Sequence, residues 1–342
     1  MHDNDARHRA SGPLVSASTE PEQFFARLFQ SDGPPRALDR DGLHGQTPNE
    51  SELLWVDLED PSDELLQEVW DACALPRQAL AFADAGTMPE VGQAGDHFWV
   101  RCVAINDQRE KELMSGTMLV RVAGPNRVVT LHRDRIDFLA GLRRDCRQVT
   151  LGSMCAESFV ATLLDRQLAG YFQAVSDYEG AIEHLEVEML DRDVGDNISE
   201  LQRLRRWASR LRRMLAPHRS VFGVMSRPDF RHSDNTLAAR HFVALDTRFE
   251  RAMDMVENAR DLVIGSFELF SSQTALRTND SMRMLTFVTV ITGLLATFVG
   301  ALGMNFDASF FQFRDGAFWM VVGGLFCFSL GAFALGRARL WF

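Results

Sequence analysis

The C-terminal part of the chain contains two uncharged apolar runs, residues 284–302 and 317–335. Each is about 19 residues long, which as a helix rising roughly 1.5 Å per residue covers the ~30 Å hydrocarbon core of a bilayer. The alternative is that both are buried helices of a soluble core. The pattern predicts two transmembrane helices, joined by a short loop that begins Gly303-Met304-Asn305.

The average composition hides these runs. The chain has 342 residues, is 46% hydrophobic and has a formal net charge of −11, which is typical of a soluble acidic protein. The polar start of the sequence, residues 1–5, lacks the apolar stretch of a signal peptide, so we expect the large N-terminal part to be cytoplasmic. The five cysteines are odd in number and form no C-x-x-C pair, so neither a disulfide nor a structural zinc site is expected.

The charges beside the two runs predict their orientation. Cytoplasmic flanks of membrane spans carry the excess of arginine and lysine. Outside the loop, the flanks carry Arg277, Arg283, Arg337 and Arg339. The loop itself has Arg314 against Asp307 and Asp315. We therefore expect a two-span protein of the plasma (inner) membrane, with both termini cytoplasmic and the loop outside.

Residues 51–150 are predicted to form an α/β domain. Strands are expected at residues 53–58, 97–105, 117–122 and 127–131, which are rich in β-branched and aromatic residues. Asp60 and Pro61 are expected to cap and begin a helix that runs to about Leu75. Residues 1–50 are rich in Pro, Gly and Asp and apolar only at residues 24–29, so we expect a mobile segment that contains at most the first elements.

From residue 151 to residue 282 the sequence is helical in character. Helices are expected at residues 154–191 and from residue 198 to near Pro217. Pro228 is the last proline, and from Thr236 to Leu302 only isolated glycines interrupt a helical pattern. One helix of this length would measure on the order of 100 Å. Its first part is a predicted cytoplasmic stalk, and its last part is the first membrane span of the hairpin at residues 283–342.

Two spans per chain cannot enclose a water-filled path, so a conducting protein of this kind must be an oligomer with the first spans around an axis. Positions three or four residues apart mark one face of the long helix. This face, called the stripe below, consists of Asn279, Met282, Leu285 (or Thr286), Thr289, Gly293, Ala296 and Gly300. Small and polar residues mixed with Met and Leu suit a narrow lumen. Gly293 and Gly300 equally suit a close helix contact without a pore, and spacing leaves both open.

The hairpin resembles the CorA family of divalent-cation transporters. The resemblance is carried by residues 278–286 before the first span, by Gly303-Met304-Asn305 at its end, and by the basic and aromatic C-terminus, residues 339–342. It implies a funnel-shaped homopentamer that moves hydrated Mg²⁺, with Co²⁺ or Ni²⁺ as further ions, through a pore with an Asn305 ring at its outer mouth. An amide ring suits an ion that gives up its water reluctantly. No cofactor is implied beyond the cations.

Other segments depart from the magnesium-transporting pattern. Leu302 stands where that family usually has an aromatic residue, the loop at residues 306–311 lacks the usual Met-Pro-Glu stretch, and the first span lacks a proline. Residues 101–106 and 212–219 are more similar to ZntB-type zinc transporters of the same superfamily. The tripeptide favours Mg²⁺, whereas the cytosolic half favours Zn²⁺, with proton coupling as a possibility implied by that branch.

Four acidic residues are further candidates for cation sites. The resemblance places Asp84 and Asp246 where the family binds regulatory cations between subunits. Glu268 lies on the extrapolated stripe, and Asp307 lies in the loop, so both could attract cations. For the first two the alternative is a solvated surface aspartate, and for Glu268 it is an outward salt bridge.

Enzymes and nucleic-acid-binding proteins are disfavoured. The histidines form no H-x-x-x-H or H-E-x-x-H pattern, and no nucleophile and base, phosphate loop or cofactor fingerprint is present. The arginine run at residues 203–213 is expected to pair with acids of the preceding helix, such as Glu186, because the chain is acidic overall. A non-conducting, membrane-tethered sensor that kept the CorA-like body remains the alternative to a transporter.

Overall fold

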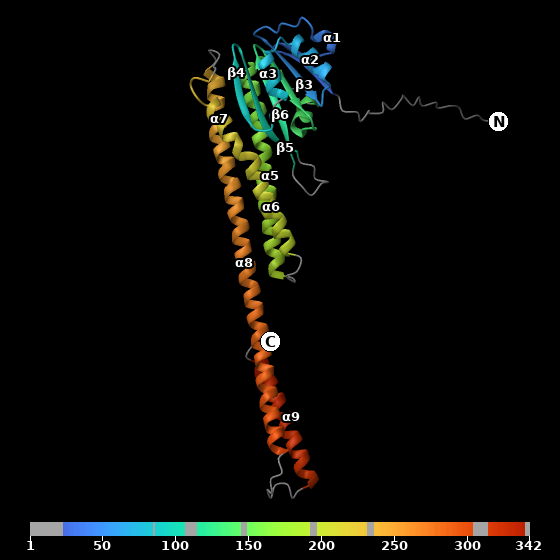
Figure 1. The fold of residues 1–342 in the computed structure, drawn as a ribbon, viewed down its shortest axis with the longest axis vertical. Coiled ribbons are helices and arrows are strands. Elements are labelled where there is room, and N and C mark those ends of the chain that lie inside the picture. Colours follow the sequence, from blue (N-terminus) through green and yellow to red (C-terminus); the bar gives the residue numbers. More distant parts are fainter. Residues whose placement is uncertain are drawn as a thin grey trace, which may run out of the picture. The chain divides into compact units, whose positions relative to one another are not determined.

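The computed structural model describes residues 23–84, 86–106, 115–144, 149–191, 197–230, 236–303 and 314–338. The chain divides into two compact units, residues 1–181 with 202–261 (unit 1) and residues 182–201 with 262–342 (unit 2). Three helices contribute to both units: α5 (Ala156–Asp191), α6 (Asn197–Leu215) and α8 (Thr236–Leu302). Figure 1 labels the elements along the chain.

A seven-stranded sheet forms the centre of unit 1, with the strand order β2-β1-β3-β7-β6-β5-β4. Its strands are β1 (Phe24–Gln30), β2 (Gly33–Leu38), β3 (Glu52–Glu59), β4 (Glu90–Ala94), β5 (His97–Asn106), β6 (Ser115–Gly124) and β7 (Arg127–His132). All neighbouring strands are antiparallel except β3 and β7, which pair in parallel. The α/β expectation is confirmed, and the four predicted strands correspond to β3, β5, β6 and β7.

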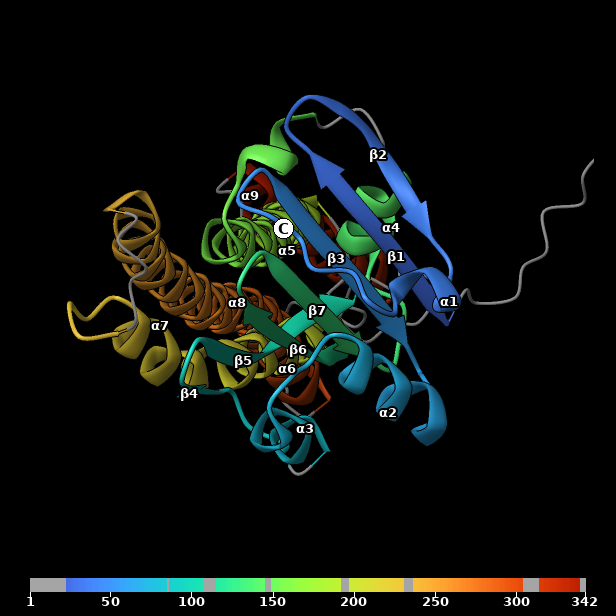
Figure 2. The ribbon, with the colours of Figure 1, turned by 90° about the horizontal axis from the view of Figure 1, so that it is seen from above.

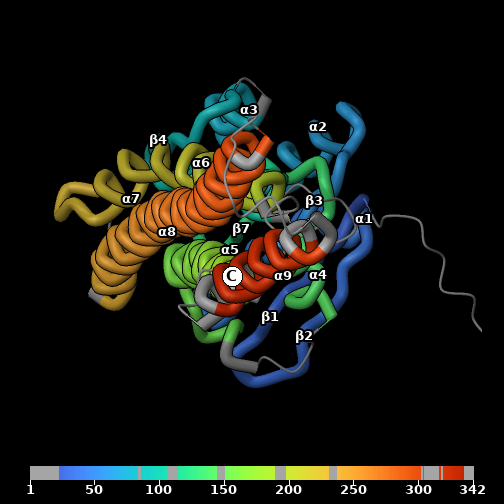
Figure 3. The backbone as a smooth tube through the Cα atoms, turned by 90° about the horizontal axis from the view of Figure 1, so that it is seen from below, coloured from blue at the N-terminus to red at the C-terminus, as the bar shows by residue number. Residues whose placement is uncertain are grey.

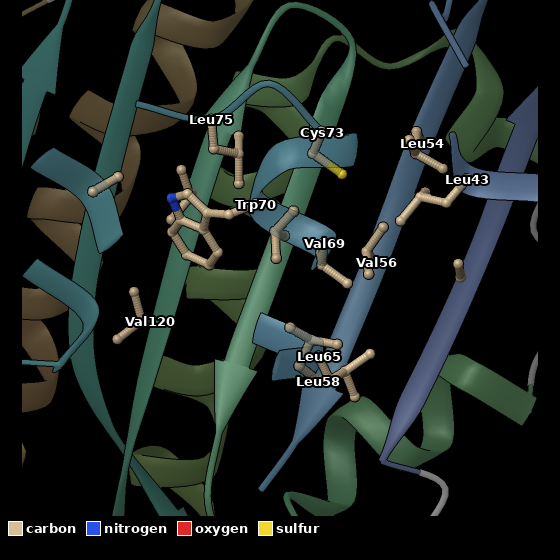
Figure 4. Packing of buried hydrophobic residues seen from close by; sticks show 14 of the residues in the cluster. Leu43, Leu54, Val56, Leu58, Leu65, Val69, Trp70, Cys73, Leu75 and Val120 are labelled. Atoms are coloured by element: carbon tan, nitrogen blue, oxygen red, sulfur yellow. The ribbon is translucent and has the colours of Figure 1, made fainter. Parts of the chain in front are cut away.

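Helices cover both faces of the sheet (Figure 2). Helices α2 (Asp63–Ala72) and α3 (Arg77–Asp84) lie on one face. Val69 and Trp70 of α2 pack with Leu54 and Val56 of β3 (Figure 4). On the other face α5 contributes Phe159, whose ring lies 5.6 Å from that of Trp55. Because β3 is covered on both faces, its residues are apolar at almost every position rather than at every second one.

The start of α2 differs from the sequence expectation. The side chain of Ser62, and not of Asp60, caps the helix, and its Oγ accepts a hydrogen bond from the backbone N–H of Leu65 at 3.3 Å. Asp60 adopts a positive φ of 46° at the end of β3, and its own N–H donates to the carbonyl of His132 at 2.8 Å. The chain therefore completes its turn out of the sheet before the helix begins.

Several elements of unit 1 were missed by the sequence patterns. Strands β1 and β2 precede residue 51 and belong to the same sheet, so they are the first elements that the sequence left open. Strand β2 contains Pro34 and Pro35, which is tolerated because it lies at the sheet edge. The other missed elements are β4, α1 (Arg40–Leu43), α3 and α4 (Asp137–Arg144).

The helical predictions agree closely with the structure. Helix α5 begins at Ala156, and α6 ends at Leu215, two residues before Pro217. A 3₁₀ turn, η2 (Ala216–His218), and α7 (Arg219–Met225) follow. Helix α8 has the predicted bounds of Thr236 and Leu302.

In unit 1, α8 buries one face through apolar residues three or four positions apart. Phe242 contacts the rings of Phe98 and Phe230 at 6.2 and 5.9 Å, and Phe249 stacks on Phe222 of α7 at 5.0 Å. All of these rings are buried. This aromatic packing holds the first part of α8 to the α/β domain.

In unit 2, the second part of α8 lies beside α9 (Arg314–Ala338), as Figures 1 and 3 show. Apolar side chains here are exposed, including Trp319 and Met320 at 70 and 68%. Among the described residues, α8 is the helix long and apolar enough to cross a membrane, and none of its apolar window is buried. The apolar part of α9, Trp319–Ala334, is shorter.

Candidate functional site

The structure brings the predicted stripe together on one face of α8, and that face is exposed. Met282 and Leu285 expose 60 and 63% of their surface, and Asn279, Thr289 and Ala296 are also exposed. A Cβ added at either remaining position, Gly293 or Gly300, would meet nothing within 4 Å. The described part of the chain therefore leaves the stripe exposed, although Asn279 and Met282 border an open hollow that Ile198 of α6 also lines.

Helix α9 packs on the other side of α8. The residues of α8 that line the groove beside α9 are Met284, Phe287, Val288, Ile291 and Thr292. With 3.6 residues per turn, the centre of this set lies roughly 150° around the helix from the centre of the stripe. The hairpin thus uses one face of α8 for its own packing and leaves the opposite face exposed.

The threonines on or beside the stripe present oxygen lone pairs. Thr289 and Thr286 each donate their hydroxyl hydrogen to the carbonyl four residues earlier, at 2.7 Å. With the hydrogen used inside the helix, each hydroxyl can only accept further hydrogen bonds. An acceptor of this kind suits the water shell of a hydrated cation.

The predicted filter lies mostly outside the described residues. Gly303 follows α8, and its N–H donates to the carbonyl of Val299 at 3.0 Å, so the backbone stays helical up to the tripeptide. Met304, Asn305 and the loop residue Asp307 are outside the described part. Their roles remain predictions.

The candidate regulatory residues are not brought into a metal site within one chain. Asp246 accepts a hydrogen bond from the Ser226 hydroxyl at 3.3 Å, and Glu268 is exposed on α8. Asp84 is the last residue of α3, and its side chain lies outside the described part. No cluster of three or more His, Cys, Asp or Glu side chains able to hold a metal occurs in the described ranges.

The two ZntB-like segments contact each other. The backbone N–H of Val103 donates to Nε2 of His218 at 2.8 Å, while Nδ1 of His218 lies 3.0 Å from the carbonyl of Leu215. This geometry requires the neutral tautomer with hydrogen on Nδ1, and burial lowers the pKa of His218 to about 4. His218 therefore joins η2 to β5, a packing role that carries no information about the transported ion.

The arginine run differs from its expected pairing. Arg212 of α6 lies 3.7 Å from Glu257 of α8, and Glu186 accepts a hydrogen bond from Ser266 at 2.6 Å. For Arg212 and Glu186, pairing between α5 and α6 was therefore the wrong expectation. Both residues stabilise contacts with α8 instead.

Arg101 of β5 holds the connection between α3 and β4, which the sequence did not indicate. Its Nε donates to the carbonyl of Met88 at 2.8 Å, its Nη2 to Glu90 at 3.0 Å, and its Nη1 to the carbonyl of Phe82. The guanidinium also lies 4.2 Å from the Phe82 ring. A Cβ on Gly86 would lie 1.8 Å from Arg101 Cζ, so a larger residue there would displace the guanidinium from its contacts. Arg101 thereby fixes the segment after Asp84.

A buried ionic network was also missed. Asp57 of β3 is fully buried and lies 2.5 Å from Arg143 and 3.3 Å from Nε2 of His132. Burial would raise the pKa of Asp57, but the hydrogen bond and charge of His132, together with Arg143, hold that pKa below its ordinary value. Burial would lower the pKa of His132, but the hydrogen bond and the charge of Asp57 outweigh burial, so the pKa of His132 is raised. One acid within an apolar strand was the available sequence signal.

The sequence of this chain is similar to those of known proteins. Residues 50–335 match the model of the family described as CorA-like Mg²⁺ transporter protein. The cobalt/magnesium transport protein CorA of Thermotoga maritima is 27% identical over 175 residues, 51% of this chain and 47% of that protein, so the match spans about half of its length. The protein of the same name from Methanocaldococcus jannaschii is 22% identical over 280 residues, 79% of this chain and 85% of that protein.

Solved structures show the same fold. The complete CorA magnesium transporter from Methanocaldococcus jannaschii has a TM-score of 0.72 at 19% identity and covers 93% of this chain and 98% of its own. Full-length CmaX has a TM-score of 0.69 at 21% identity, covering 93 and 99%. The ZntB cytoplasmic domain from Vibrio parahaemolyticus has a TM-score of 0.50 at 12% identity, covering 75 and 98%. The part of the chain that precedes the hairpin shares a fold with both branches.

Proposed function

The chain belongs to the family of CorA-like Mg²⁺ transporter proteins, and we propose that it is a homopentameric transporter that moves hydrated Mg²⁺ across the inner membrane. Co²⁺ and Ni²⁺ are the further candidate ions. In this proposal α8 and α9 each cross the membrane, and both termini are cytoplasmic. The protein is not proposed to be an enzyme.

One observation carries the proposal: the stripe on α8 is exposed on the face opposite α9. Five copies of α8 arranged around an axis would turn this face inward, where it would line the path with small residues and threonine oxygens. The family membership supports the same arrangement.

The proposed filter is a ring of Asn305 after the end of α8. Amide oxygens can accept hydrogen bonds from the waters of a hydrated ion without the trapping charge of a carboxylate ring. The membrane potential supplies about 2.3 kcal/mol per elementary charge per 100 mV, hence roughly twice that for a divalent cation. Inward movement therefore needs no further energy source.

Regulation is proposed to occur through cytosolic cation binding. Asp84 and Asp246 are the proposed ligands, contributed by neighbouring copies, and Glu268 is proposed to attract cations toward the inner end of the path. Two acids from different chains would explain why a metal cluster is not found in the described ranges of one chain.

The decisive experiment is cation flux in proteoliposomes, measured for Mg²⁺, Co²⁺, Ni²⁺ and Zn²⁺ with and without a pH gradient. We expect Mg²⁺ flux that is independent of the pH gradient and is abolished by Asn305→Ala, with the assembly intact. Asn258→Ala, an exposed amide on α8 away from the stripe, is the matched control and should retain flux. Flux of Zn²⁺ alone, driven by a pH gradient, would place the protein in the zinc branch, and no flux of any ion would favour the sensor.

A further inference from the structure

A pocket of about 670 Å³ lies in unit 1 at the carboxyl ends of the parallel strands β3 and β7. Asp60 follows β3 and lines the pocket, as do Arg133 and Asp134, which follow β7. The N–H of Asp60 donates to the carbonyl of His132 at 2.8 Å, so the two strand ends are held together. Ligands of α/β sheets commonly bind beyond the carboxyl ends of parallel strands, and this volume suits a small molecule.

The floor of the pocket is apolar. Side chains from two helices and three strands form it: Leu66 of α2, Ala83 of α3, Val103 of β5, Met118 and Val120 of β6, and Leu131 of β7. A ligand that fits this floor needs an apolar body, because a strongly hydrated ion would gain nothing from these contacts.

The rim of the pocket is polar and negatively charged. Three exposed aspartates, Asp60, Asp63 and Asp134, line it against one exposed arginine, Arg133. The buried His132 lines the pocket as well, but Asp57 lies 3.3 Å from its Nε2 and balances its charge. The rim therefore favours a positively charged ligand.

A buried hydroxyl in the lining adds a hydrogen-bond acceptor. Thr117 is 4% exposed, and its hydroxyl donates to Asp134 at 2.6 Å. With its hydrogen used in this bond, the Thr117 oxygen can only accept further hydrogen bonds. A ligand that donates N–H groups matches this oxygen and the carboxylates of the rim.

The start of α2 disfavours an anionic ligand. The Ser62 oxygen already accepts from the N–H of Leu65. The carboxylate of Glu64 accepts from its own backbone N–H and from the Ser62 hydroxyl, which lowers the pKa of Glu64. Because these side chains satisfy the first N–H groups and Asp63 adds a negative charge, the helix offers little attraction to a phosphate.

The acids of the rim are spread apart. They do not form a metal site, because no group of three His, Cys, Asp or Glu side chains able to hold one ion occurs in the described parts of the chain. A single inorganic cation therefore cannot contact all of them at once. A ligand with several positive charges, separated by apolar links, can.

We propose that this pocket binds an aliphatic polyamine. Its methylene chain lies on the apolar floor, and its ammonium groups donate to Asp63, Asp134 and the Thr117 oxygen. Aliphatic ammonium groups such as that of lysine are charged at neutral pH, and their methylene stems pack on apolar surfaces. The proposal does not depend on transport by the chain.

Spermidine is the probe that tests the ligand class. It is titrated by calorimetry into the full-length protein in a neutral detergent, with Mg²⁺ in excess to occupy sites for inorganic cations. We expect one spermidine to bind per chain. Butylamine, an aliphatic chain with a single ammonium group, should bind on the order of tenfold more weakly, because it can pair with only one carboxylate at a time.

Three sets of variants test the location. Asp63→Asn combined with Asp134→Asn should weaken spermidine binding on the order of tenfold. Arg133→Gln should strengthen it by about two- to fivefold, because a repulsive charge is removed, and a folding defect cannot produce this gain. Asp71→Asn removes an exposed acid of α2 outside the pocket lining and is the matched control, with binding equal to that of the wild type.

Three results would overturn the proposal. The first is the absence of spermidine binding to the wild type, and the second is unchanged or weaker binding to the Arg133 variant. The third is equal weakening by Asp71→Asn and by the double variant, which would show attraction to the acidic surface as a whole. Calorimetry does not measure flux, so a failure of transport and a failure of this proposal are separate outcomes.

Discussion

The two halves of helix α8 place their apolar side chains in opposite surroundings. In unit 1, Phe242, Phe249 and Val256 expose 1, 0 and 0% of their surface. In unit 2, Val290 and Phe298 of the same helix expose 59 and 54%. The secondary structure does not change between them, so the difference lies in what each half is built to contact. The first half is stabilised by its own chain, and the second requires an apolar medium or further copies.

The largest expected effect is in the buried half. Phe249→Ala should lower the free energy of unfolding by about 3–5 kcal/mol, because the ring stacks on Phe222 and leaves a cavity when removed. Phe326→Ala in α9, where the ring is 64% exposed, should change it by about 0.5 kcal/mol or less. Denaturant unfolding of the full chain in detergent measures both. Equal losses would break the contrast between the two regions.

A charge inserted into each half should produce the next largest effect. Phe298→Arg should impair membrane insertion, at a cost somewhat below the about 2.5–3.5 kcal/mol for arginine at a span centre, because Phe298 lies four residues from the end of the run at Leu302. Val243→Arg, at a position of similar exposure in unit 1, should change insertion and stability by no more than about 0.5 kcal/mol. The fraction of protein in carbonate-washed membranes measures insertion. Normal insertion of the Phe298 variant would contradict a membrane role for this half.

A smaller, local effect is expected at the start of α2. Ser62→Ala should lower the free energy of unfolding of unit 1 by about 1 kcal/mol, because the N–H of Leu65 loses its acceptor. Ser209→Ala is a suitable control, since the Ser209 hydroxyl is exposed and only bonds the carbonyl of Arg205 within α6. Thermal unfolding measures the two variants. If Asp60→Ala were the more damaging substitution, the assignment of the cap would be wrong.

The smallest expected change is the response of unit 1 to pH. The pKa of His132 in the folded protein is raised above its ordinary value of 6.5. The contribution of His132 to the free energy of unfolding is therefore complete below pH 6.5 and is lost as the pH rises through the folded pKa. The melting temperature should therefore fall in the alkaline direction. His132→Gln should remove this dependence, whereas His241→Gln, on an exposed position of α8, should retain it. An unchanged profile in His132→Gln would contradict the paired imidazolium.

The extent of prediction from sequence differed between the regions for a physical reason. Helix α8 was predicted to the residue because it lacks proline and its pattern is local. Strands β1 and β2 were left open because their pairing with distant strands, and not their own composition, makes them strands. The prediction that Asp60 caps α2 was wrong because the backbone of Asp60 is fixed by its hydrogen bond to the carbonyl of His132.

The candidate site divides in the same way. The stripe could be predicted because helical periodicity alone places its members on one face. The hydrogen bonds of Arg101 and the network of Asp57 with His132 and Arg143 depend on long-range contacts. For each of them, the only signal in the sequence was a charged residue within an apolar strand. The role of Asn305 remains a prediction from resemblance.

The most direct test of the account is to ask whether the stripe lines the ion path. Thr289→Cys on the stripe and Val290→Cys beside it are introduced into a cysteine-free background, and Mg²⁺ flux into proteoliposomes is measured before and after a water-soluble thiol reagent. We expect the reagent to block flux through the Thr289 variant and to leave the Val290 variant unaffected. Equal flux through both variants after modification would contradict it.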